Sequence, residues 1–202
     1  PAGSGGPAWQ EAAGVLLDII GENRAAVAGV KMSLLDADSE VWVRERLPEG
    51  VRMFTGDDFH YVGLIGGDSL TGAAAPEGSA SRGHSDALRG AFAALAPAAS
   101  AAIQALDAND PERYLDLLGP TEELSRQVFA APTYYYKTGV AFLSWLNGHQ
   151  PAFQMVGGLH SARSLPHLSR IVELANGALA LERPELARER WHGLLRLNGV
   201  DA

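Results

Sequence analysis

Hydrophobic positions at the start of the chain recur every three or four residues and then give way to a short, unbroken apolar run. The first pattern, carried by Trp9, Leu16 and Ile20, predicts a helix over about residues 8–23. The second, over residues 27–33, predicts a short buried strand. A helix followed directly by a strand is the start of an alternating α/β pattern.

The alternation continues to about residue 92. A helix capped by Asp36 or Asp38 is predicted to end at Leu47, where Pro48 and Gly50 stop it. The next predicted elements are a strand over 51–55, a short helix ending at Gly66-Gly67, a flexible loop over 67–85 and a third strand over 87–92. Strands separated by helices form right-handed βαβ units, so the three strands are expected to be parallel.

The chain is predicted to be helical after Pro97. Pro111 begins one helix, Gly119-Pro120 is expected to split it, and later helices are predicted over 134–146, 165–179 and 185–197. A closed (β/α)₈ barrel needs eight strands, so three strands can form only part of one. We therefore expect a partial βα barrel over residues 1–96 and C-terminal helices over 97–202, packed together as one domain.

Composition narrows the class of protein. The 202 residues are 47% hydrophobic and 20% charged, with a net charge of -8, which indicates a globular protein and argues against nucleic acid as a partner. Residues 90–106, a run without charge, are too few and too rich in alanine to span a membrane. The first ten residues do not resemble a secretory signal and there is no cysteine, so we expect a cytoplasmic location.

Lysine is rare in this chain, and one lysine lies inside an apolar strand. Lys31 and Lys137 stand against 14 arginines. Strand alternation puts Lys31 on the face opposite Val30 and Met32, which is the barrel interior if those two residues meet helices. A buried lysine loses its proton more easily, and a neutral amine can attack a ketone to form a Schiff base. The alternative is a lysine whose ammonium extends from the strand end into solvent.

The sequence "VAGVKMSLLDAD", followed 25 residues after Lys31 by "GDD", resembles the dihydrodipicolinate synthase/N-acetylneuraminate lyase family, and is closest to an uncharacterised bacterial branch of it. "LRGAFAALAPAASAAIQALDANDPERYLDLLGPTEELSRQVF" and "APTYYYKTGVAFLSWLNGHQ" agree with its C-terminal part, so the resemblance covers about residues 20–180. It implies a class I aldolase on a TIM barrel. It also implies Lys31 as the Schiff-base lysine, with Thr55, Gly56 and Asp57 binding a 2-keto acid.

The family's proton-relay tyrosine and its carboxylate-binding motif lie before the segment that the resemblance covers. We therefore expect a C-terminal portion of a lyase or aldolase that acts on a 2-keto acid such as pyruvate, needs no cofactor and is inactive as this fragment alone. The alternative is a non-catalytic barrel remnant that binds a small acid or a partner chain. An unpaired strand edge predicts that the isolated chain self-associates, and a homo-oligomer is expected.

Two other groups of residues are candidates for a functional site. Asp57, Asp58 and His60 include metal-ligand types, but their spacing matches no known site, and Asp58 suits a helix N-cap; we expect no metal. In "GGLHSARSLPHL", residues 157–168, Arg163 and a helix start at Ser164 suit a carboxylate or phosphate. A capped loop with Arg163 in a surface ion pair is the alternative reading.

Overall fold

The computed structural model describes residues 7–72 and 83–201. The chain divides into two compact units, of which the first ends at Arg89 and the second begins at Gly90. The boundary lies before the one predicted between residues 96 and 97, because the 3₁₀ helix η1 (Gly90–Ala94) packs against α5 and α7 of the second unit.

The first unit contains a three-stranded parallel sheet. Its strands β1 (Gly29–Met32), β2 (Arg52–Thr55) and β3 (Asp86–Ala87) lie side by side in sequence order, which confirms the α/β class. Met32 pairs with Thr55, and Thr55 pairs with Ala87, so the three strands end at the same edge. The third strand is much shorter than predicted, since glycine and alanine after it favour a strand only weakly and form η1 instead.

Helices α1 (Pro7–Glu22) and α2 (Ala37–Arg44) supply one side of the core of this unit. Asp36 caps α2 by accepting the backbone N–H of Ser39 at 3.1 Å, as predicted. The core joins the two helices to β1 and β2 through Ala13, Ile20, Met32, Val43, Leu47, Val51 and Met53. Trp9 and Trp42 pack edge to face beside it, 5.3 Å between ring centroids.

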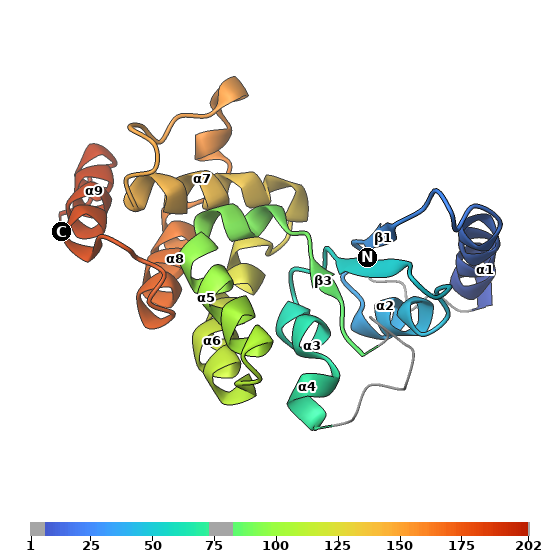
Figure 1. Cartoon of the computed structure of the whole chain (residues 1–202). Coiled ribbons are helices and arrows are strands. Elements are labelled where there is room, and N and C mark those ends of the chain that lie inside the picture. Colours follow the sequence, from blue (N-terminus) through green and yellow to red (C-terminus); the bar gives the residue numbers. More distant parts are fainter. Residues whose placement is uncertain (1–6, 73–82, 202) are drawn as a thin grey trace. The chain divides into compact units, whose positions relative to one another are not determined.

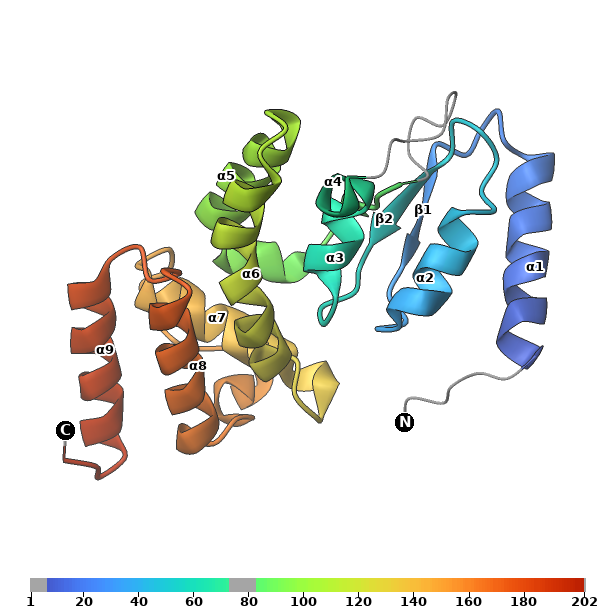
Figure 2. The ribbon, with the colours of Figure 1, turned by 90° about the horizontal axis from the view of Figure 1, so that it is seen from below.

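The helix after β2 forms as predicted. The helix α3 (Tyr61–Gly66) contacts β2 and β3, and the single turn α4 (Asp68–Thr71) follows it. In both Figure 1 and Figure 2, α2 and α3 lie on the same side of the sheet. Most of the predicted flexible loop, residues 73–82, lies outside the described residues.

The second unit is helical, as predicted. Its α-helices are α5 (Ala96–Asp107), α6 (Pro111–Val128), α7 (Tyr136–Leu146), α8 (Leu165–Gly177) and α9 (Pro184–Leu197), with short 3₁₀ helices η2 (Thr133–Tyr135) and η3 (Val156–Ser161) between them. Fully buried side chains such as Tyr114, Leu118, Phe142 and Ile171 form its core.

The predicted break at Gly119-Pro120 is wrong, because α6 continues through Pro120. Proline removes one backbone hydrogen bond from a helix, but Pro120 is exposed while Leu118, Thr121 and Leu124 beside it are fully buried. The buried face therefore holds the helix together where local propensity would end it.

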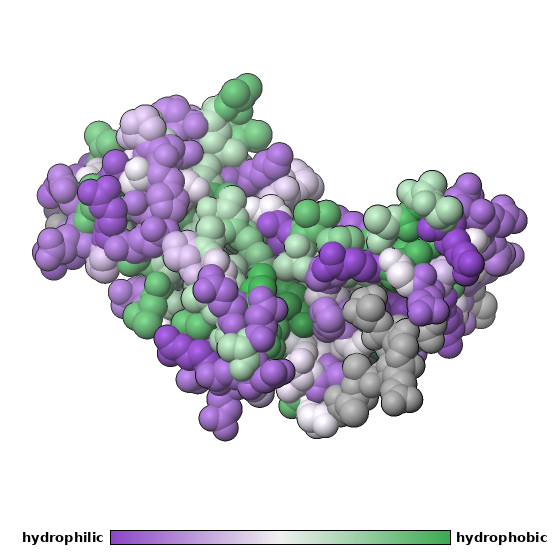
Figure 3. Space-filling model, viewed as in Figure 1, coloured by the Kyte–Doolittle hydropathy of each residue, from purple (hydrophilic) through white to green (hydrophobic). Residues whose placement is uncertain are grey.

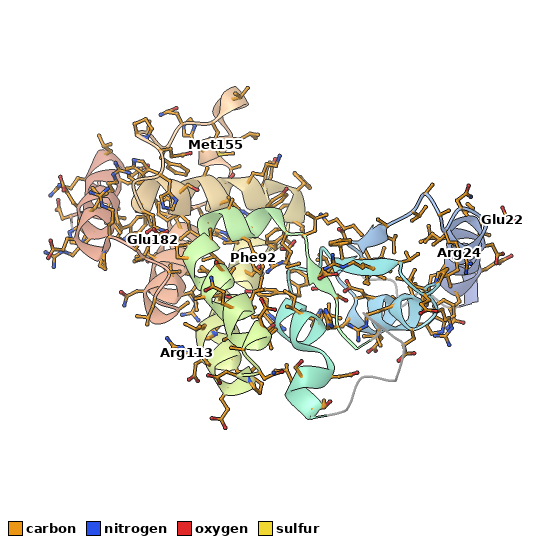
Figure 4. The ribbon with its side chains drawn as sticks, viewed as in Figure 1. Glu22, Arg24, Phe92, Arg113, Met155 and Glu182 are labelled. Carbon is orange, nitrogen blue, oxygen red and sulfur yellow. The ribbon has the colours of Figure 1, made fainter. Side chains whose placement is uncertain are left out.

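The connection between α7 and α8 packs on α7 through Phe153 and η3, and its tip protrudes in Figure 1. Met155, labelled in Figure 4, lies in it just before η3. Val156 is 94% exposed, and Figure 3 shows hydrophobic atoms at this tip. Among the described helices, none combines the length and the apolar character that crossing a bilayer requires.

Candidate functional site

Lys31 lies near the carboxyl end of β1, on the face opposite the helices. Met32 is buried among the residues of α1 and α2, so the alternation of a strand turns Lys31 to the other face, as predicted. The side chain of Lys31 passes over Gly56, where an added Cβ would lie 2.6 Å from its Cε atom. Gly56 also extends the strand pairing, since its N–H donates to the carbonyl of Met32 at 2.6 Å. Gly56 thus gives Lys31 a path along the edge where the strands end.

Of the two interpretations of Lys31, a buried amine or a lysine that extends into solvent, the described chain shows the second. Lys31 is exposed, because no described segment of the first unit covers its face of the sheet. Lys137, the other lysine, is also exposed and lies in α7 of the second unit.

A buried ion pair lies at the same edge. Arg89, two residues after β3, donates to one carboxylate oxygen of Asp58 from Nε at 3.0 Å and from Nη2 at 2.5 Å. The side chain of Arg89 is 0% exposed, and its guanidinium lies 3.4 Å from the centroid of the Tyr61 ring. Burial raises the pKa of Asp58, while the charges of Arg89 and Lys31 lower it. Arg89 therefore ties the segment after β3 to the turn after β2.

Sequence reasoning missed Arg89 as a site residue. It did carry a signal, because Arg89 interrupts an apolar run directly after a predicted strand start, as Lys31 does. An isolated cation in a buried strand needs a buried anion, and the nearest candidates along the sheet edge were the two aspartates of "GDD".

Asp57 binds the turn that leads into α3. It is 1% exposed, and its Oδ1 accepts the backbone N–H groups of Phe59 at 2.6 Å and of His60 at 2.8 Å. Its Oδ2 lies 3.1 Å from Nδ1 of His60. Asp57, rather than Asp58, therefore caps this turn, whereas His60, the N-cap residue of α3, makes no side-chain cap bond. Both oxygens of Asp57 bond within the turn, and its predicted contact with a substrate stays a prediction.

Thr55 lies on the helix-facing side of β2. It is 0% exposed, and its hydroxyl donates to Oε2 of Glu40 on α2 at 2.9 Å. The same hydroxyl accepts the backbone N–H of Asp57 at 3.1 Å. Thr55 pairs with Met32, so its side chain lies on the face opposite Lys31, and its predicted role in binding a 2-keto acid stays a prediction. Thr55 links α2 to the turn that holds Asp57.

Buried polar groups lie beneath the sheet edge. Burial raises the pKa of Glu40, an effect that hydrogen bonds from Ser85 and Thr55 partly oppose. Arg44 donates from Nη1 to the hydroxyl of Ser85 at 3.1 Å and to the carbonyl of Leu64 at 3.3 Å. Burial lowers the pKa of Arg44, whereas the charge of Glu40 raises it. These groups tie α2, α3 and β3 together below the site.

We expect Glu40→Gln to stabilise the protein at pH 8 and to have little effect near pH 4. A carboxyl whose pKa is raised in the folded state favours folding while protonated, and that contribution is lost as pH rises through the folded pKa. Glutamine keeps the size and an oxygen for the Thr55 hydroxyl but cannot ionise. Urea denaturation at pH 4 and pH 8 measures both differences. A variant less stable than the wild type at pH 8 would show that the ionised form of Glu40 is required.

The candidate metal ligands do not gather around one point. Asp57 pairs with His60, and Asp58 pairs with Arg89. Within residues 7–72 and 83–201, no cluster of three or more histidine and acidic side chains suited to a metal ion is present. The charged side chains described at this edge are thus Lys31, which passes over Gly56, and the Asp58–Arg89 pair.

Comparison with known proteins gives a family and no described activity. No curated protein matches the chain. A model of a family of proteins of unknown function, DUF993, matches residues 3–200. That match spans nearly the whole sequence, so the chain belongs to the DUF993 family.

Proposed function

We propose that this protein is a Schiff-base-forming lyase or aldolase that acts on a 2-keto acid such as pyruvate, with Lys31 as the nucleophile. The observation that carries the proposal is the place of Lys31 near the carboxyl end of a parallel strand, on the face away from the helices. Enzymes built on (β/α)₈ barrels keep their catalytic groups at that end of the strands.

The fold of the first unit supports a barrel origin. A closed βα barrel has parallel strands in sequence order, with helices outside and the opposite faces inside. The order β1-β2-β3, with α2 and α3 on one side, follows that plan (Figure 2). In such a barrel the face that carries Lys31 and Phe54 would be the interior, and the remaining strands would cover it.

Formation of the Schiff base requires few protein groups around Nζ of Lys31. The neutral Nζ of Lys31 attacks the keto carbon, and the resulting carbinolamine takes up one proton from water and loses its oxygen as water, which leaves a protonated imine. The reaction needs a neutral amine, and covering the nitrogen from water disfavours its charged form. Asp58, which follows β2 at the same edge of the sheet, is the acid that we propose to stabilise the cationic imine.

Reductive trapping tests the proposal. Incubating the full-length protein with pyruvate and borohydride is expected to add the mass of pyruvate less one oxygen atom, located by peptide mapping at Lys31. Lys31→Arg should abolish this product, because a guanidinium forms no Schiff base. Lys137→Arg is the matched control, since it removes the other lysine, and should leave trapping unchanged. An adduct that persists in Lys31→Arg would contradict the proposal.

The exposure of Lys31 favours a second candidate, a non-catalytic site for a small acid or a partner chain. An ammonium in water attracts a carboxylate without reacting with it. Under this reading, pyruvate binds the full-length protein in calorimetry, the affinity falls in Lys31→Gln, and borohydride traps nothing. Trapping at Lys31 would exclude this candidate.

A further inference from the structure

A cavity of about 910 Å³ lies within the second unit. Trp145 of α7, the connection that follows it, the start of α8 and the last turns of α9 line this cavity, which we call the α7–α9 pocket. Its volume is in the range of pockets that hold small organic molecules. The connection includes Met155 and is the extended segment in Figure 4.

One wall of the α7–α9 pocket is aromatic and aliphatic. The rings of Trp145 and Phe153 are stacked, with centroids 5.8 Å apart and planes 21° apart. Leu165, Leu168 and Leu194 continue the apolar wall. Such a surface favours a flat or branched hydrocarbon group.

Two arginines supply the charge of the α7–α9 pocket. Arg163 and Arg190 line it together with His160, and no aspartate or glutamate is among its lining residues. Within the described part of the chain, neither guanidinium pairs with a carboxylate. In a protein of net charge -8, a pocket with two unpaired guanidinium charges and no acid is complementary to an anion.

Arg163 is fixed in place by backbone carbonyls. It is 9% exposed, and its Nη1 and Nη2 donate to the carbonyls of Ala131 at 3.2 Å, Ala130 at 2.6 Å and Pro132 at 3.1 Å. Its Nε is buried without a hydrogen-bond partner in the described chain. The predicted surface ion pair of Arg163 is therefore wrong, whereas the predicted cap at Ser164 is confirmed by its bond from the N–H of His167 at 3.4 Å.

Arg190 has N–H groups that are available to a ligand. Its Nη1 donates to the carbonyls of Trp145 and of Gln150, the latter at 3.2 Å, which fixes the guanidinium beside the Trp145 ring, 5.5 Å from its centroid. Among the described residues, none accepts a hydrogen bond from Nε or Nη2 of Arg190. Those two parallel N–H groups form the fork that binds a carboxylate with two hydrogen bonds.

We propose that the α7–α9 pocket binds a small carboxylate with an aromatic or branched apolar body, its carboxylate on Arg190 and its body against Trp145 and Phe153. The positive charge of Arg163 and the N-terminus of α8 strengthen the attraction for the anion. This site is separate from the lysine site, so it does not depend on the proposed lyase activity.

Binding of 3-phenylpropionate to the full-length protein, followed by titration calorimetry, tests the proposal. The neutral analogue 3-phenylpropan-1-ol is expected to bind at least about tenfold more weakly, because it cannot form charge-assisted hydrogen bonds. Arg190→Gln should weaken binding of the acid by about tenfold or more and leave the alcohol unchanged. Arg188→Gln, an exposed arginine of α9 outside the lining of this pocket, is the matched control and should bind as the wild type does.

A second variant fills the cavity without disturbing the fold. Gly193 lines the α7–α9 pocket from α9, and an added Cβ meets no atom within 4 Å, so Gly193→Leu should fold normally and abolish binding. Equal affinity for the acid and the alcohol would overturn the proposed recognition of the carboxylate. Failure of 3-phenylpropionate to bind at millimolar concentration, or unchanged binding in Gly193→Leu, would overturn the proposed site.

Discussion

Asp58→Ala is expected to destabilise the first unit by about 3–5 kcal/mol. Arg89 is 0% exposed in its side chain and donates twice to Asp58, so the variant leaves a buried guanidinium without the carboxylate that faces it. Removing one partner of a buried ion pair costs far more than the pair contributes, because the remaining charge stays out of water. Urea denaturation, combined with hydrogen exchange of peptides from β1, β2 and β3, measures the loss and locates it.

The control removes an acid of the same type from the surface. Asp18 is exposed on α1, and Asp18→Ala is expected to change stability by less than about 0.5 kcal/mol. Replacing both partners, as Asp58→Asn with Arg89→Met, should cost less than Asp58→Ala alone, since methionine can lie on Tyr61 without a charge to satisfy. If Asp58→Ala matched Asp18→Ala in stability, the ion pair would not be a structural requirement of this edge.

Gly56→Ala is the second substitution from which we expect a large effect, on both stability and trapping of pyruvate. An added Cβ would lie 2.6 Å from Cε of Lys31 and 2.8 Å from the carbonyl oxygen of Met32, so the strand edge must shift. We expect a loss of about 1–3 kcal/mol in stability from this overpacking. On the proposed mechanism, displacement of Lys31 should also slow trapping of pyruvate by about 10²-fold, since catalysis tolerates little misplacement of a reacting group. The rate of adduct formation under borohydride measures the second effect.

Gly63 provides the matched glycine control. It is exposed in α3, and an added Cβ meets no atom within 4 Å. Gly63→Ala is therefore expected to stabilise the protein by about 0.5–1 kcal/mol, because alanine loses less backbone freedom in a helix, and to trap pyruvate at the wild-type rate. Trapping at the wild-type rate in Gly56→Ala would show that the passage of Lys31 over Gly56 does not matter for the chemistry.

The elements with strong local signals were predictable. The helices α1, α2, α8 and α9 formed where periodicity, caps and prolines placed them, because the buried stripe and the helix ends are encoded locally. The elements that differ depend on partners distant in sequence. The buried face of α6 carries it through Pro120, and the strand expected over residues 87–92 ends early because η1 packs against helices of the second unit.

The candidate site likewise has features that the sequence predicted and features that it did not. Strand alternation placed Lys31 on the face opposite Met32, because the period of a strand allows only two faces, and the structure showed that Met32 is the one that meets the helices. Neither the pairing of Asp58 with Arg89, 31 positions away, nor the capping role of Asp57 could be read from spacing. The exposure of Lys31 could not be read from the sequence either, because it depends on which segments cover the side chain in the folded protein.

The local sequence pattern thus determined which segments form helices and strands, that the strands are parallel, and on which face of its strand Lys31 lies. Only the tertiary structure determined which charged side chains lie together. Examples are the Asp58–Arg89 pair and the arrangement of Arg163 and Arg190 around one cavity. The physical reason is that backbone hydrogen bonding and periodicity act between near neighbours, whereas burial of charge is settled by groups that only the fold brings together.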